Sequence, residues 1–197
     1  MLYSLYPFKR GDLIVFSGNK LDAVLVKWLT KSNYSHLAIV LDVYPEMNED
    51  DKAIIIESTT YTSLPDFKNR KCQPGVQIHN LENWLSAYQS CGKAWCIPLK
   101  EPLSSEATGR MQKWLWNLYE HQVSYSCGKA IGSWLKINQY FVHSERQSIN
   151  RMFCSELVTQ ALQIAGAIDK SILACQQTPH EVSVLPCFDS PVLLECS

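Results

Sequence analysis

Three residues that lie far apart in the sequence, Cys154, His36 and Glu57, could together perform nucleophilic chemistry. Cys154 falls at the start of a predicted helix, where unsatisfied backbone N–H groups and the helix dipole favour a thiolate. The thiolate is the form of cysteine that acts as a nucleophile. The same position also suits a small buried cysteine on an amphipathic helix, because buried structural cysteines are common.

His36 opens a predicted strand, and its chemistry depends on a carboxylate in the strand that follows. If the two strands pair antiparallel with Ile39 opposite Ile54, Glu57 lies directly opposite His36 and shares its face of the sheet. The carboxylate can then accept a hydrogen bond from one imidazole nitrogen and leave the other for a thiol. A register shift by one residue would move Glu57 to the other face. Without such a partner, a histidine at a strand end is more often a structural residue.

Glu57 directly follows three isoleucines, Ile54 to Ile56. A charged group at the end of such an apolar run needs a partner or water. We therefore expect Glu57 to orient His36. The alternative is a strand-end carboxylate that simply reaches solvent.

The surrounding sequence predicts the elements that would position these residues. Apolar and β-branched runs bounded by turn-forming residues predict strands over residues 12–16, 36–41, 53–59, 75–78 and 94–99. Apolar residues at helical spacing predict helices over residues 21–29, 81–85, 111–119, 128–135 and 153–165. The tail after Thr178 predicts irregular structure, and most of the scattered tryptophans are expected in the core. Together these elements predict one α+β domain over residues 1–197.

The composition excludes several classes of protein. The 197 residues are 46% hydrophobic and 19% charged, with a net charge of -1, which argues against global disorder and against a nucleic-acid-binding surface. No segment is apolar enough to span a membrane, and the N-terminus does not resemble a secretory signal. We therefore expect a cytoplasmic protein with free thiols. Cys91 and Cys96 could suggest a metal site, but no second ligand pair follows at a suitable spacing, so we expect no metal.

Four segments carry a resemblance to a known family. In chain order they are Gly11-Asp12-Leu13-Ile14, Ser35-His36-Leu37-Ala38-Ile39-Val40, Ile56-Glu57-Ser58-Thr59 and Phe153-Cys154-Ser155-Glu156-Leu157-Val158. This ordered set resembles the permuted, YiiX-like branch of the NlpC-type papain-fold cysteine hydrolases. In that branch the histidine strand precedes the cysteine helix, as it does here. The residues Gly75 to Ile78, Leu81, Trp84 and Thr178-Pro179 also fit, so the resemblance spans roughly residues 11–180.

The resemblance implies a circularly permuted papain-like fold, with an antiparallel sheet or half-barrel packed against helices that include the cysteine helix. It implies Cys154 as the nucleophile, His36 as the base and Glu57 as the group that orients His36. The backbone N–H of Cys154 would donate to the oxyanion. A tyrosine upstream of the cysteine is often close to the active site in this family, and Tyr125 is the best match. Tyr125 could equally be a core aromatic residue. The resemblance implies no cofactor and no metal.

The resemblance leaves three functions open. The first is a cysteine-dependent amidase or peptidase that acts on a peptide, another amide or an ester through a thioester intermediate. The second is an acyl-lipid transferase or phospholipase of the lecithin retinol acyltransferase type. The third is a binding module that has kept the fold and lost turnover. We expect no nucleic-acid partner, and the sequence leaves the oligomeric state open.

Overall fold

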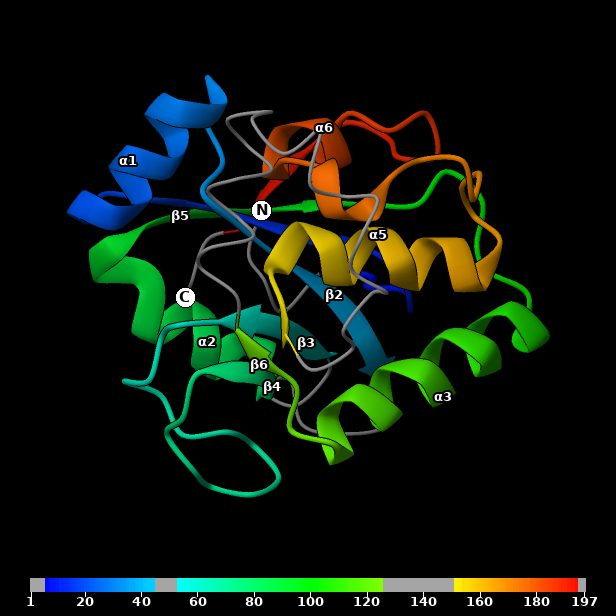
Figure 1. The fold of residues 1–197 in the computed structure, drawn as a ribbon, viewed down its shortest axis with the longest axis horizontal. Coiled ribbons are helices and arrows are strands. Elements are labelled where there is room, and N and C mark those ends of the chain that lie inside the picture. Colours follow the sequence, from blue (N-terminus) through cyan, green and yellow to red (C-terminus); the bar gives the residue numbers. More distant parts are fainter. Residues whose placement is uncertain (1–5, 45–52, 126–150, 195–197) are drawn as a thin grey trace, which may run out of the picture.

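A six-stranded sheet in which every pair of neighbouring strands is antiparallel forms the centre of the structure (Figure 1). The computed structural model describes residues 6–44, 53–125 and 151–194. The strands follow the spatial order β4-β3-β2-β1-β5-β8. Their bounds are β1 Leu13–Gly18, β2 His36–Val43, β3 Ala53–Thr59, β4 Gly75–Asn80, β5 Gly92–Ile97 and β8 Val192–Leu194. A separate parallel pair consists of β6 Ser124–Tyr125 and β7 Arg151–Met152.

Helices cover both faces of this sheet. Their bounds are α1 Leu21–Thr30, α2 Leu81–Tyr88, η3 Gln89–Cys91, α3 Ser105–Glu120, α5 Cys154–Ala165, η5 Ala174–Gln176 and α6 Pro179–Ser183. Helices α3 and α5 pack against each other, and α5 lies over β2 and β3. Helix α2 packs against β3, β4 and β5. The apolar side chains of the sheet accordingly divide between one buried cluster with α3 and α5 and another with α2.

The central strands are apolar on both sides because both sides are covered. In β1, Leu13 and Val15 belong to the cluster under α3 and α5, whereas Ile14 and Phe16 belong to the cluster with α2. All four side chains are fully buried. Burial on both faces explains why the sequence shows continuous apolar runs in place of alternation.

The cysteine helix α5 has the expected limits. Phe153, the N-cap, has extended backbone angles, and Gly166 ends the helix with a left-handed φ of 80°. A glycine tolerates this conformation without steric cost, which accounts for its place after the helix. The buried side of α5 includes Leu157, Val158 and Leu162. The predicted helix over 153–165 is therefore confirmed.

The α+β prediction is confirmed, and one detail of it, the irregular tail, is wrong. The tail predicted as irregular contains α6 and β8, and β8 extends the sheet by pairing with β5. Helix α1 forms as expected, but Trp28 is 74% exposed and does not belong to the core. The predicted helix over residues 128–135 lies outside the described residues. Within the part of the chain that the structure describes, no helix is both long and apolar enough to cross a membrane.

Candidate active site

Strands β2 and β3 bring His36 and Glu57 together, with a register different from the predicted one. Ile39 pairs with Ile56, not with Ile54, and Glu57 lies directly opposite Ala38. The predicted pairing is therefore wrong by two residues. Because side chains alternate with a period of two, this shift keeps His36 and Glu57 on the same face as diagonal neighbours. His36 Nε2 lies 2.5 Å from Glu57 Oε2.

A β-bulge in β2 changes the pairing of β2 with β3 beyond Val40. Val40 pairs with Ile55, and Asp42 pairs with Ile54, so Leu41 is an extra residue with no partner of its own on β3. A bulge of this kind adds one residue to one strand and changes the pairing beyond it. It lies beyond the segment that carries His36, so the face shared with Glu57 is preserved.

The carboxylate of Glu57 is fully buried and lies among three nitrogen-bearing side chains. Oε2 contacts His36, Oε1 accepts a hydrogen bond of 2.6 Å from Trp84 Nε1, and His79 Nε2 lies 3.5 Å from Oε1. Burial by itself raises the pKa of Glu57, but the neighbouring His36, His79 and the Trp84 N–H together hold this pKa below its usual value. Glu57 therefore remains a carboxylate at neutral pH, held in a fixed orientation.

His36 lies between this carboxylate and the thiol of Cys154. Burial lowers the pKa of His36, but the charges of Glu57 and of the Cys154 sulfur, together with hydrogen bonds to both, raise it from 6.5 to about 10. Since Nε2 faces Glu57, Nδ1 is the nitrogen left for the sulfur. The Phe16 ring lies beside the imidazole, with their centroids 5.8 Å apart. The structure thus brings the three predicted residues into one cluster.

His79 differs from His36 although both face the same carboxylate. Burial lowers the pKa of His79, and this effect outweighs the attraction of Glu57 and Asp66. His79 Nε2 also lies 3.1 Å from Gln77 Oε1. At neutral pH the charged partner of Glu57 is therefore His36, and His79 acts as a neutral neighbour.

Cys154 is the first residue of α5 and is 1% exposed. The first hydrogen bond of this helix runs from Leu157 N–H to the Phe153 carbonyl, so the preceding N–H groups have no acceptor within the helix. Phe153 has no side-chain oxygen that could cap them. The helix start therefore offers backbone N–H donors beside the sulfur.

Two hydrogen bonds, one buried and one partly buried, hold the chain on either side of Cys154. Ser58 Oγ, on β3, donates to the Met152 carbonyl at 2.7 Å. Ser155 Oγ donates to the Gln177 carbonyl at 2.6 Å. The first bond ties the cysteine segment to the strand that carries Glu57, so the distance between nucleophile and carboxylate is fixed by the fold.

Ser58→Ala is expected to lower the free energy of unfolding by about 1–3 kcal/mol, because the buried Met152 carbonyl loses its donor. Chemical denaturation followed by circular dichroism measures this loss. Ser63→Ala, at an exposed serine, is the control and should change the free energy of unfolding by less than about 0.5 kcal/mol. Equal stability of both variants would contradict the structural role given to Ser58.

Tyr125 lies close to the cysteine segment. Its backbone pairs with Met152 across β6 and β7, and its half-buried ring packs against Phe153, which directly precedes Cys154. The predicted proximity to the cysteine therefore appears in the structure, and a role in binding the oxyanion or the substrate stays a prediction.

Trp84 and His79 contact Glu57, and the sequence did not predict this role for either residue. Trp84 stacks on Phe16, with ring centroids 4.6 Å apart, and its indole N–H donates to Glu57. A buried tryptophan usually needs a partner for this N–H. Helix α2 directly follows β4, and Trp84 lies on its apolar side. This placement could have indicated from the sequence that Trp84 is buried and that its N–H needs a partner. His79 of β4 gave no comparable signal, because a histidine within a strand is usually structural.

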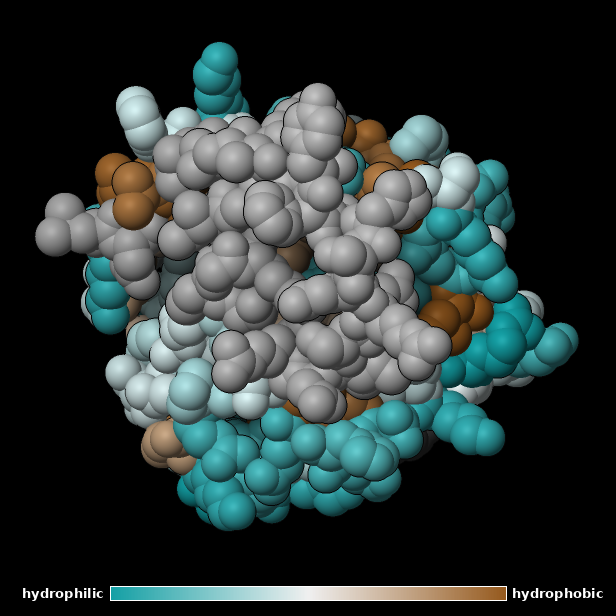
Figure 2. All heavy atoms as spheres, viewed as in Figure 1, coloured by the Kyte–Doolittle hydropathy of each residue, from teal (hydrophilic) through white to brown (hydrophobic). Residues whose placement is uncertain are grey.

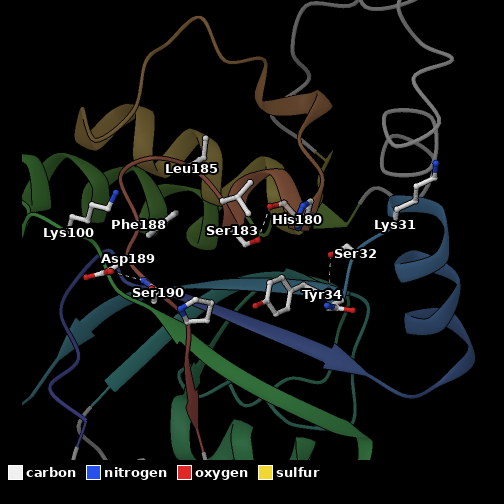
Figure 3. A pocket seen from close by; sticks show the side chains of 13 residues that line it. Lys31, Ser32, Tyr34, Lys100, His180, Ser183, Leu185, Phe188, Asp189 and Ser190 are labelled. Carbon is white, nitrogen blue, oxygen red and sulfur yellow. Dashed lines mark hydrogen bonds between the residues drawn. The ribbon is translucent and has the colours of Figure 1, made fainter.

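A pocket of about 520 Å³ lies between the segment that precedes His36 and helix α6, and its lining includes none of Cys154, His36 and Glu57. Figure 3 shows Tyr34 on one side of it and His180 with Ser183 on the other. Tyr34 lies two residues before His36. Helix α6, which carries His180 and Ser183, begins two residues after Gln177, the hydrogen-bond acceptor of Ser155. The two walls of the pocket therefore continue along the chain into the segments that carry His36 and Cys154.

The fold and the cluster together define a mixed α+β protein with a cysteine, a histidine and a glutamate assembled at the start of a helix. No protein-family model matches the chain, and no curated protein matches it. Among solved structures, the crystal structure of the metalloprotein YiiX from Escherichia coli O157:H7, described as DUF1105, has a TM-score of 0.52 and 14% sequence identity. The alignment covers 95% of this chain and 89% of YiiX. The predicted YiiX-like fold is therefore confirmed at the level of overall architecture.

YiiX is described as a metalloprotein, so the cluster was tested for metal ligands. Among residues 6–44, 53–125 and 151–194, no three or more histidine, cysteine, aspartate or glutamate side chains are placed to hold a metal ion. Both Glu57 oxygens already accept from His36 and Trp84. These described residues do not fit a metal ion.

Proposed function

We propose that this chain is a cysteine hydrolase in which Cys154 attacks an amide or ester carbonyl, with an amidase or peptidase as the preferred activity. The observation that carries the proposal is the contact of 2.5 Å between His36 Nε2 and the buried Glu57 carboxylate, which turns the other imidazole nitrogen toward Cys154. A nucleophile, a base and a group that orients the base are the parts that covalent acyl transfer requires.

The proposed reaction has two halves. In the proposed reactive pair the proton of Cys154 already resides on His36, whose pKa is raised, and the thiolate attacks the substrate carbonyl to form a tetrahedral oxyanion. Collapse of this species breaks the bond to the leaving group, which takes the proton from His36, and a thioester remains on Cys154. His36 then accepts a proton from water as the hydroxyl attacks the thioester, which releases the acid and restores the Cys154–His36 pair.

The surroundings of each residue support this division of roles. Glu57 keeps His36 oriented and raises its pKa, which favours the protonated form that can give a proton to the leaving group. The N–H groups at the start of α5 support an oxyanion site next to the sulfur. The pocket walls include hydroxyl and amide side chains, among them Ser32, Asn33 and Tyr34, and a polar pocket of this kind suits a peptide or another amide substrate.

The chain order also supports the permutation that the sequence suggested. The histidine strand β2 precedes the cysteine helix α5 in the chain, as in the permuted branch of the papain-like hydrolases. We propose that this chain is circularly permuted in the same sense. Transfer of a lipid acyl group and binding without turnover are the competing functions.

Thiol labelling tests the proposed activation of Cys154. With iodoacetamide at pH 6, Cys154 is expected to react at least about tenfold faster than the other cysteines, because an ordinary thiol is almost fully protonated there. His36→Ala should remove this preference. Peptide mapping by mass spectrometry identifies the labelled residue and gives its rate.

Cys96 is the matched control for labelling, because it is also buried and burial raises the pKa of its thiol. It should stay unlabelled in the folded wild type and in His36→Ala. Slow and uniform labelling of all cysteines, with no effect of His36→Ala, would rule out an activated Cys154 and support the binding module.

A further inference from the structure

Helix α1 presents an apolar surface to solvent. Val24 is 45% exposed, Leu25 is 53% exposed and Trp28 is 74% exposed. Their spacing of one and four residues places them on one side of the helix. Figure 2 shows hydrophobic residues gathered over α1, at the upper left of the molecule. These three residues are called the α1 face below.

The opposite side of α1 already holds the helix on the body of the protein. Val26 packs against Phe153, and Lys27 Nζ lies 3.3 Å from Ser17 Oγ at the end of β1. Packing of the fold therefore accounts for the inner side of the helix. It does not account for the three apolar residues on the outer side, since an exposed aliphatic and aromatic patch has no stabilising role within the folded chain.

Exposed lysines lie at both ends of the α1 face. Lys20 and Lys31 are the N-cap and C-cap residues of the helix, whereas Lys27 is directed toward Ser17 on the inner side and is not one of them. Lys93, which is exposed, pairs across the sheet with Ser17. Asp22 is the single acidic residue between positions 20 and 31. The chain as a whole has a net charge of -1, so this positive charge is a local property of α1.

We propose that α1 is an interfacial helix that docks the protein on an anionic lipid bilayer. The α1 face would enter the boundary between headgroups and acyl chains, and the lysines would contact the headgroups. Tryptophan and leucine on one side of a helix with lysines around them are typical of such helices. Lysine is depleted at protein–protein interfaces, so the same surface fits a protein partner less well.

Docking in this way would bring the pocket close to the membrane surface. Lys31 ends α1 and also lines the pocket, as Figure 3 shows. Val26 joins α1 to Phe153, the residue before Cys154. Packing between Val26 and Phe153 thus joins the docking surface to the proposed catalytic site, although membrane binding does not depend on the proposed reaction.

Vesicle binding tests the proposal without any measurement of turnover. The full chain is sedimented with phosphatidylcholine vesicles that contain or lack phosphatidylglycerol. We expect binding to the anionic vesicles that weakens as salt is added. Leu25→Asp should lower the partition coefficient at least about tenfold, because it removes apolar contact and adds a negative charge.

Leu173→Asp is the matched control. Leu173 is the same residue type with the same exposed fraction, 53%, and lies just before η5. This variant should change the partition coefficient less than about twofold, since it leaves α1 intact. Trp28→Gln gives a second test on the α1 face if Leu25→Asp does not fold.

Three results would overturn the proposal. They are no binding of the wild type to anionic vesicles, equal losses in Leu25→Asp and Leu173→Asp, and retained binding in both Leu25→Asp and Trp28→Gln. Size-exclusion chromatography adds a check. If the wild type is a dimer that Leu25→Asp dissociates, the α1 face serves a second copy of this chain, and the membrane assignment is wrong.

Discussion

Cys154→Ala is expected to lower the rate of hydrolysis by at least about 10⁴-fold, the scale on which a covalent catalytic unit fails when its nucleophile is removed. The reason is that no other described thiol shares the surroundings of Cys154, which combine the start of α5 with an imidazole oriented by a buried carboxylate. Steady-state hydrolysis of p-nitrophenyl acetate, and of p-nitroanilide peptides, measures the effect.

Cys96→Ala controls for the loss of a buried sulfur. Cys96 lies in β5, is fully buried, and has no histidine among its charged or hydrogen-bonded neighbours. Its replacement should leave the hydrolysis rate within about twofold of the wild type, provided that the variant is folded, since the side chain takes no part in the proposed reaction. Equal rates in wild type and Cys154→Ala would exclude Cys154 as the nucleophile.

Glu57→Ala is expected to lower the free energy of unfolding by about 3–5 kcal/mol, because it removes one partner of a buried ion pair. The variant leaves both His36 and the Trp84 N–H without the acceptor they share. Glu57→Gln should cost less, because an amide oxygen can still accept from Trp84. Chemical denaturation at several pH values measures both variants.

The pH dependence of this loss has a definite sign. The lowered pKa of Glu57 means that its stabilising contribution is present above 4.5, its ordinary value, and is lost as pH falls through the lower value of the folded state. The pKa of His36 rises from 6.5 to about 10, so its contribution is present below 6.5 and is lost as pH rises toward about 10. The difference between wild type and Glu57→Gln should therefore be largest between pH 4.5 and 6.5.

Glu106→Ala is the matched control for Glu57. The side chain of Glu106 is 85% exposed and forms an ion pair with Arg110 one helical turn away in α3. Exposed pairs of this kind contribute little, so the variant should lose less than about 0.5 kcal/mol at every pH. A Glu57→Ala loss no larger than this would show that the buried carboxylate does not hold the cluster together.

The sequence was sufficient for the strands and helices around the site and insufficient for their fine pairing. The apolar runs of β2 and β3 predict strands because both faces of the sheet are covered. Their register is set by pairing between two strands that are both apolar on both faces, so no local pattern fixes which residues lie opposite each other, and the bulge at Leu41 changes the pairing again beyond Val40. His36 and Glu57 still meet because the error of two residues preserves the face.

Helix α1 illustrates a different limit of sequence reasoning. The spacing of Val24, Leu25 and Trp28 identifies a one-sided helix, but periodicity does not reveal whether that side meets the core or solvent. Strand β8 escaped prediction because its three residues gain strand structure only by pairing with β5, a partner far away in the chain. Both features depend on tertiary contacts that local patterns do not encode.

The hydrogen bond between Trp84 and Glu57 also depends on tertiary contacts that the local sequence does not encode. Burial of Trp84 follows from its place on the apolar side of α2, whereas its partner follows only from how α2 lies against β3. The sequence therefore did not predict the contacts of Trp84 and His79 with Glu57, whereas it did predict Cys154 and His36 as members of the cluster. Long-range polar contacts of this type require the folded arrangement.

The wide separation of the reacting groups along the chain has a consequence for biosynthesis. His36 and Glu57 emerge from the ribosome early, whereas Cys154 and the Gln177 carbonyl that anchors its neighbour Ser155 emerge late. A nascent chain that ends before α5 can carry the histidine and its carboxylate but has no sulfur beside them. The proposed activity would therefore be absent during most of translation and would arise only after residue 154, in the last quarter of the 197 residues, has been added.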